Sequence, residues 1–156
     1  MVNWFLDFEA YQISGKFYPV EICLVNGETK TCNLFYVRYN FIHCSPTTTF
    51  QFKKHGIHWD EGNVTLRRAL KAILNRVQMC DIIFVKGHQK RVFLQKYLWF
   101  DRKVEEIICP LSIRDLVQMY RNEACSKHRH HNSNNLSCAR HKSFALASFF
   151  DNVVCA

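Results

Sequence analysis

Residues 3–9 read NWFLDFE, an apolar run in which Asp7 and Glu9 stand at alternate positions. Alternate side chains of a strand lie on the same face, so this run predicts a buried strand that carries two neighbouring acids. The next run, FYPVEICLVNG at 17–27, predicts a second strand. Its Asn26-Gly27 pair is a strong hairpin signal, so we expect the chain to turn back there into a third, antiparallel strand.

That third strand is expected over 28–39, and residues 40–58, with Pro46 and three successive Thr, read as an irregular connection. The hydrophobic spacing then predicts, in order, a helix from Asn63 to Met79, a strand over 81–86, a helix after Gly87, a strand over 105–111, a helix from Ser112 to Met119 and a last helix over 139–151. Helical connections make the fourth and fifth strands parallel, and right-handed connections place them beside the first strand. The predicted fold class is α/β: an RNase H-like mixed sheet of three antiparallel and then two parallel strands, with helices on both faces and a zinc-ordered loop.

The composition indicates one folded domain over residues 1–156. The chain is 48% hydrophobic and has only three Pro and five Gly, which excludes disordered and low-complexity classes. No apolar run reaches the roughly 18 residues of a membrane span, and the first residues do not resemble a signal peptide. We therefore expect an intracellular protein, cytoplasmic or nuclear, that does not contact a membrane. Its cysteines are expected to be reduced, and those that occur singly in apolar runs are interpreted as core thiols: Cys23, Cys32, Cys80, Cys109 and Cys155.

The net charge of +8 is concentrated in residues 81–156, which hold twelve Lys or Arg against seven Asp or Glu. Clustered cations of this kind suit phosphate, although an ordinary solvated surface has the same composition. The residues expected to contact nucleic acid are Lys86, Lys90, Arg91, Lys96, Lys127, Arg129, Arg140 and Lys142. Aromatic residues that would stack on bases are Trp59, Trp99 and Tyr120.

A polar segment contains two Cys-x2-His pairs, Cys125 with His128 and Cys138 with His141. Thiolate and imidazole are the usual ligands of structural zinc, and this segment has almost nothing apolar to bury. Zinc is therefore the expected cofactor. A disordered basic loop is the alternative, and the intervening His130 and His131 leave the ligand set open on spacing alone.

With Glu21 in the second predicted strand, these residues resemble the Glu-Cys-His-Cys zinc signature of the Maelstrom domain, an RNase H-like domain, and of similar stand-alone arthropod proteins. The runs IIFVKGHQKRVFLQKYL at 82–98 and CARHKSFALASFF at 138–150 also fit that family. The resemblance implies a structural zinc held by Glu21, Cys125, His128 and Cys138. Local spacing makes His141 the alternate fourth ligand.

The same resemblance implies a function in nucleic-acid binding. Maelstrom domains are associated with single-stranded RNA, with weak metal-independent RNA cleavage and with silencing of transposons through small RNAs. The implied partners are therefore single-stranded RNA and proteins of a silencing complex.

A standard exonuclease of this fold needs about four carboxylates around a pair of Mg²⁺ ions. Asp7 and Glu9 match the first acidic pair, but the helix after Gly87 offers Lys90 and Arg91 where the second acid is expected. The last acid is also missing, so the four-acid site is degenerate. Asp7 and Glu9 are the candidate catalytic residues for any residual activity. Two alternatives stay open: a 3′–5′ exonuclease that uses Mg²⁺ or Mn²⁺ at these two acids, and a non-catalytic scaffold for protein interaction.

Overall fold

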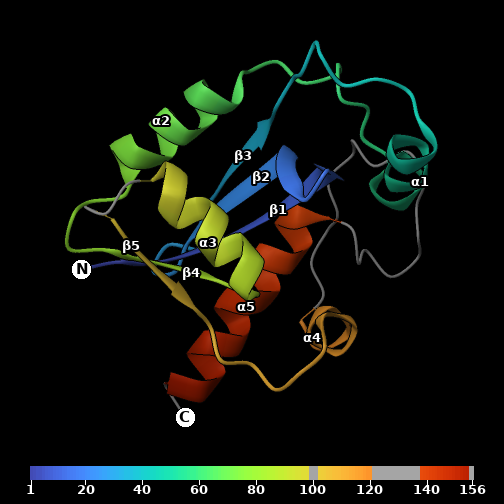
Figure 1. Ribbon diagram of the computed structural model, residues 1–156. Helices are drawn as coiled ribbons and strands as arrows, with labels where there is room; N and C mark the ends of the chain where they lie inside the picture. Colours follow the sequence, from blue (N-terminus) through green and yellow to red (C-terminus); the bar gives the residue numbers. More distant parts are fainter. Residues whose placement is uncertain (99–101, 121–137, 155–156) are drawn as a thin grey trace.

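The computed structural model describes residues 1–98, 102–120 and 138–154 and folds around a five-stranded mixed sheet of order β3-β2-β1-β4-β5 (Figure 1). The strands are β1 (Asn3–Ile13), β2 (Lys16–Asn26), β3 (Cys32–Tyr36), β4 (Ile82–Val85) and β5 (Lys103–Glu106). The pairs β1–β2 and β2–β3 are antiparallel, whereas β1–β4 and β4–β5 are parallel. The predicted sheet, including its strand order, is confirmed.

The turn between β1 and β2 was not anticipated from the sequence. Ser14 and Gly15 have φ values of 51° and 77°, the two positive values that a tight hairpin turn requires. Asn26 instead opens a longer loop, in which its side-chain oxygen accepts hydrogen bonds from the N–H groups of Glu28 and Thr29. Gly27 is needed there because a Cβ atom would lie 2.4 Å from the carbonyl oxygen of Asn3. The hairpin between β2 and β3 was therefore predicted correctly, but β3 starts four residues later than expected because the loop between them is long.

The connection after β3 contains a helix that the sequence analysis missed, α1 (Pro46–His55). Its Thr-rich composition is a poor helix signal, but its ends are well capped. The Ser45 side chain accepts from the Thr48 N–H, the Thr48 hydroxyl bonds back to the Ser45 N–H, and Gly56 closes the helix with φ of 72°. Capping at both ends of α1 compensates for the weak helix propensity of its residues.

The remaining helices are α2 (Leu66–Arg76), α3 (His88–Tyr97), α4 (Ile113–Met119) and α5 (Ala139–Val154). Ser112 caps α4 as predicted, but α2 begins after Thr65 rather than at Asn63 because the Thr65 hydroxyl accepts from the Arg68 N–H. Strand β5 ends at Glu106, earlier than the predicted 105–111.

The helices cover both faces of the sheet, as predicted. Leu6 and Phe8 of β1 join the apolar layer under α2 and α3, whereas Phe5 joins the layer under α4 and α5. Because side chains alternate along a strand, Asp7 and Glu9 share the face of Phe5 and point toward α5. A register shift between Glu9 and Ala10 ends this alternation just after the two acids. In the described part of the chain, none of the helices is both long and apolar enough to cross a membrane.

Candidate functional site

Asp7 and Glu9 lie on the central strand of the sheet and are almost completely buried, with exposed fractions of 3% and 7%. Two buried carboxylates on one face of a strand are costly unless cations neutralise them. The structure supplies those cations from α3 and α5, which cover opposite faces of the sheet.

Lys142, in the second turn of α5, is the first of these cations. Its Nζ atom lies 3.0 Å from Asp7 Oδ2 and also forms an ion pair with Glu9 Oε1, so a single ammonium group bridges the two carboxylates. The Lys142 side chain is only 9% exposed. This single buried charge neutralises the two carboxylates together.

Lys90, in the first turn of α3, is the second cation. Its Nζ atom lies 2.5 Å from Asp7 Oδ1 and 3.0 Å from the carbonyl oxygen of Phe8. Burial alone would raise the pKa of Asp7, but the attraction of Lys142 and then of Lys90 outweighs it and holds that pKa below its ordinary value. For Lys142, burial lowers the pKa, but the two acids outweigh burial and raise the pKa above the ordinary lysine value. For Lys90, burial is the stronger influence and lowers the pKa, although Asp7 opposes it.

A cavity of about 860 Å³ opens in front of this cluster. Its charged lining residues are Asp7, Lys86, Lys90, Glu106 and Lys142. Among the residues that the structure describes, no group of three or more His, Cys, Asp or Glu side chains could hold a metal ion. Among the described residues, the two acids expected to bind Mg²⁺ form ion pairs with lysines instead.

The predicted zinc ligands are only partly within the described residues, because Cys125 and His128 lie outside them. The other two meet at the start of α5. The fully buried Glu21 accepts a 2.6 Å hydrogen bond from the backbone N–H of Ala139, the residue that follows the buried Cys138. His141, the alternate ligand, is also buried one turn further along α5. The fold therefore places Glu21 beside the first residue of α5, and the zinc site itself stays a prediction.

The interpretation of the cysteines as single core thiols is partly wrong. Cys23 and Cys32 form a pair on neighbouring strands, with Sγ atoms 3.1 Å apart, and Cys80 is exposed rather than buried. The hydrogen bond from Cys23, helped by Arg140 and opposed by burial, lowers the pKa of Cys32 to about 7. The two cysteines are nine residues apart in the sequence, and the β2–β3 loop brings their thiols together, so the sequence pattern does not reveal the pair. Cys155 lies outside the described residues.

The basic residues predicted to bind nucleic acid divide into three groups. Lys90 and Lys142 are paired with acids, and Lys86 donates to the carbonyl oxygen of Cys109 beside the same cavity. Lys96 is exposed at the end of α3, whereas Arg91 and Arg140 are half-buried, with Arg140 over the ring of Phe144. Lys127 and Arg129 lie outside the described residues.

Of the predicted stacking residues, Trp59 is half-buried against His58, with ring centroids 3.9 Å apart, and Tyr120 is half-buried with its hydroxyl accepting from Asn152. Trp99 lies outside the described residues. Five further exposed cations were not predicted, namely Lys16, Arg38, Arg67, Arg68 and Lys71. Arg67, Arg68 and Lys71 are close together in the sequence of α2, whereas Lys16 and Arg38 come from two other segments.

Neither family models nor curated proteins match this sequence. Solved structures do match the fold. One, described as "3'-end specific recognition of histone mRNA stem-loop by 3'-exonuclease", has a TM-score of 0.67 and 13% identity and covers 98% of this chain and 63% of that chain. A second, described as "crystal structure of full-length 3'-exonuclease", has a TM-score of 0.58 and 13% identity and covers 99% of this chain and 81% of that chain. The present chain thus spans less than two thirds of the first of these proteins. The fold is that of the 3′-exonucleases, and the prediction of an exonuclease-like sheet is confirmed.

Proposed function

We propose that this chain is a single-stranded RNA-binding domain built on a 3′-exonuclease fold and that it binds RNA without Mg²⁺ or Mn²⁺ at Asp7 and Glu9. The observation that carries the proposal is the position of Lys142, whose ammonium group bridges Asp7 and Glu9. Two-metal hydrolysis requires divalent cations at such carboxylates to stabilise the attacking and leaving oxygens. Here a metal would first have to displace a buried lysine.

The choice of RNA rests on the structural neighbours and on charge. One neighbour recognises an mRNA stem-loop at its 3′ end, and the present chain carries a net charge of +8. The acids that would repel phosphate near the sheet are neutralised by Lys90 and Lys142. A basic protein of this fold whose two acids form ion pairs with lysines is better suited to RNA binding than to metal-dependent RNA cleavage.

Weak RNA cleavage by Asp7 and Glu9 stays a prediction, with one physical argument against it. A general base must accept a proton near the working pH, and the lysines hold the pKa of Asp7 below its ordinary value. We therefore propose binding as the main activity and expect any cleavage to be slow.

We also propose that zinc held by Glu21, Cys125, His128 and Cys138 fixes the start of α5 against β2. The contact between Glu21 and the Ala139 N–H supports this proposal, because it already ties the two elements together. Membership of a Maelstrom-like silencing complex, with its protein partners, stays a prediction from the resemblance.

The proposal is tested by binding a fluorescent single-stranded RNA of about 15 nucleotides, a length within the range of one such site, in buffer without added divalent cation and in Mg²⁺. We expect equal affinity in both, steep weakening with salt, and no Mg²⁺-dependent shortening of the RNA on a denaturing gel. Mg²⁺-dependent cleavage that is lost in Asp7→Asn would establish the exonuclease alternative instead. Absence of RNA binding at low salt would refute the proposal and favour the protein scaffold.

A further inference from the structure

Three hollows follow one another over the outer side of α3 and α2. The first, of about 500 Å³, lies between the β1–β2 turn and α3; the second, of about 550 Å³, lies between α3 and α2; the third, of about 580 Å³, lies at the start of α2. Lys96 and Tyr97 line both the first and the second, and Leu66 and Arg67 line both the second and the third. The shared residues show that the three hollows adjoin one another, and we call the three together the groove.

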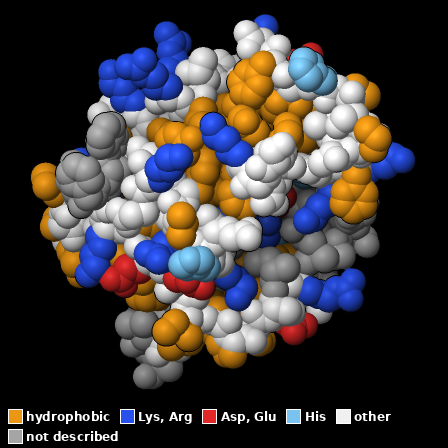
Figure 2. Space-filling view, in the orientation of Figure 1, with side chains coloured by type: hydrophobic (Ala, Val, Ile, Leu, Met, Phe, Trp, Pro, Cys, Tyr) orange, Lys and Arg blue, Asp and Glu red, His pale blue; other side chains and the backbone are white. Residues whose placement is uncertain are grey.

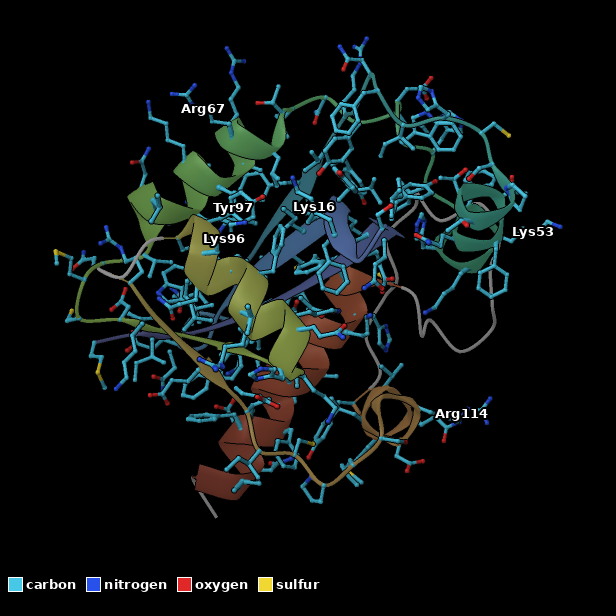
Figure 3. The ribbon with its side chains drawn as sticks, in the orientation of Figure 1. Lys16, Lys53, Arg67, Lys96, Tyr97 and Arg114 are labelled. Carbon is cyan, nitrogen blue, oxygen red and sulfur yellow. The ribbon has the colours of Figure 1, made fainter. Side chains whose placement is uncertain are left out.

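The charge of this groove has one sign. Its basic lining residues, which we call the basic track, are Lys16, Arg38, Arg67, Arg68, Lys71 and Lys96. No Asp or Glu occurs among the described residues that line it, and no described carboxylate forms an ion pair with any member of the track. Figure 2 shows Lys and Arg side chains around an apolar area on this face, and Figure 3 shows Lys16, Lys96 and Arg67 along it. Unlike the lysines at Asp7, these cations are available for phosphate.

Aromatic rings lie between the cations. Tyr97 and Phe17 are half-buried in the first hollow, and Phe41 in the third is 52% exposed. The Phe41 ring packs edge-on against Tyr18 and Tyr39, with centroids 5.5 and 5.6 Å away, so its position is fixed while about half of it stays open. Fixed rings beside cations are the arrangement on which unpaired bases stack, whereas a duplex offers no free base faces along its length.

The groove also reaches the cavity at Asp7. A smaller hollow of about 310 Å³ shares Gln12 and Phe17 with the first part of the groove and shares Lys90 and Lys142 with that cavity. We propose that the basic track binds an extended single strand of RNA, which runs from the Asp7 cavity across α3 to the start of α2. This assignment rests on the proposed function and adds to it the path of the strand.

The test compares two double variants that change charge equally. Arg67→Glu/Lys96→Glu alters the track, and Lys53→Glu/Arg114→Glu alters exposed residues of α1 and α4 that line none of the hollows described above (Figure 3). Each phosphate contact on a single strand contributes about 0.7 to the slope of log affinity against log salt. Loss of two contacts therefore lowers this slope by about 1.4. If the variant and the unmodified chain bind equally at about 1 M salt, the variant then binds roughly 25-fold more weakly at about 0.1 M salt. We expect this loss for the track variant and a much smaller one for the control.

The outcomes separate the path from the function. Equal weakening by the two variants refutes the path but leaves RNA binding in place, whereas absence of RNA binding by the unmodified chain refutes the proposed function itself.

Phe41→Ala should weaken binding of a single strand roughly tenfold and leave binding of a duplex unchanged. If polyglutamate binds as tightly as RNA and depends on the same track residues, the partner is an acidic protein rather than RNA, and the proposal is wrong. Urea midpoints of all variants verify that each is folded.

Discussion

Replacement of Lys142 by Met is the sharpest test of the charge cluster at Asp7 and Glu9. Met keeps the apolar stem of the lysine and removes its charge, so packing changes little. Asp7 retains Lys90, but Glu9 loses the ammonium group with which it pairs, and its side chain is only 8% exposed. Removal of one partner from a buried ion pair costs about 3–5 kcal/mol because the other charge is left uncompensated. We expect the free energy of unfolding to fall by this amount.

Urea denaturation followed by circular dichroism measures the loss. With a slope of about 2 kcal/mol per M, the midpoint should fall by roughly 2 M. The double variant Lys142→Met/Glu9→Gln is the matched control, because it removes both charges and should recover most of the stability. A single variant as stable as the unmodified chain, or a double variant less stable than the single one, would refute the reasoning. Titration with Mn²⁺ gives a second readout: Lys142→Ala should gain binding at the freed carboxylates, and equal binding by the unmodified chain contradicts the claim that Lys142 excludes metal.

Four further outcomes are expected. The lysines hold the pKa of Asp7 below its ordinary value, so the Asp7 carboxylate stabilises the fold above about pH 4. This stabilisation is lost as the pH falls through the pKa of Asp7 in the folded state. The difference in unfolding free energy between the unmodified chain and Asp7→Asn, measured in urea, should therefore shrink over that pH range. Alkylation of Cys32 should rise with pH through a midpoint near 7, because its pKa is about 7 and the thiolate is the reactive form; mass spectrometry locates the site, and a midpoint at the ordinary thiol value of about 8.5 contradicts this expectation. Gly62→Ala should cost roughly 1–3 kcal/mol of unfolding free energy, since its Cβ would lie 2.4 Å from the carbonyl carbon of Val37. Glu21→Ala should lower the zinc content of the purified protein; full retention of zinc would transfer the fourth ligand position to His141.

Much of the fold could be predicted from the sequence because its elements have strong periodic signals. The alternation in residues 3–9 located β1 and set Asp7 and Glu9 on one face, and the helical connections gave the strand order. The helix α1 could not be predicted in this way, because its stability comes from caps at Ser45 and Gly56 rather than from apolar spacing. The Ser14-Gly15 turn could not be located because the predicted first strand ends at residue 9, whereas β1 continues to Ile13.

The candidate site was predictable in its acids but not in its cations. The sequence indicated that Lys90 stands where a nuclease needs an acid, and the structure places it against Asp7. The role of Lys142 depends on the rotation of α5 against the sheet, which brings one residue of that helix between two acids 133 or more positions away in the chain. Tertiary packing alone determines such a contact, so local pattern does not contain it.

The cluster at Asp7 and the basic track differ in the balance of their charges. Asp7 and Glu9 cancel the charges of Lys90 and Lys142, so this cluster contributes nothing to the net charge of +8. The surplus must therefore lie elsewhere, and the basic track holds six cations without an acid among its described neighbours. Under the proposals above, a change of Lys142 should act mainly on stability and metal exclusion, while a change of Arg67 should act on RNA affinity. If the track binds RNA, mutations of the two groups should be additive in their effect on RNA binding, because the two surfaces do not share a charged contact.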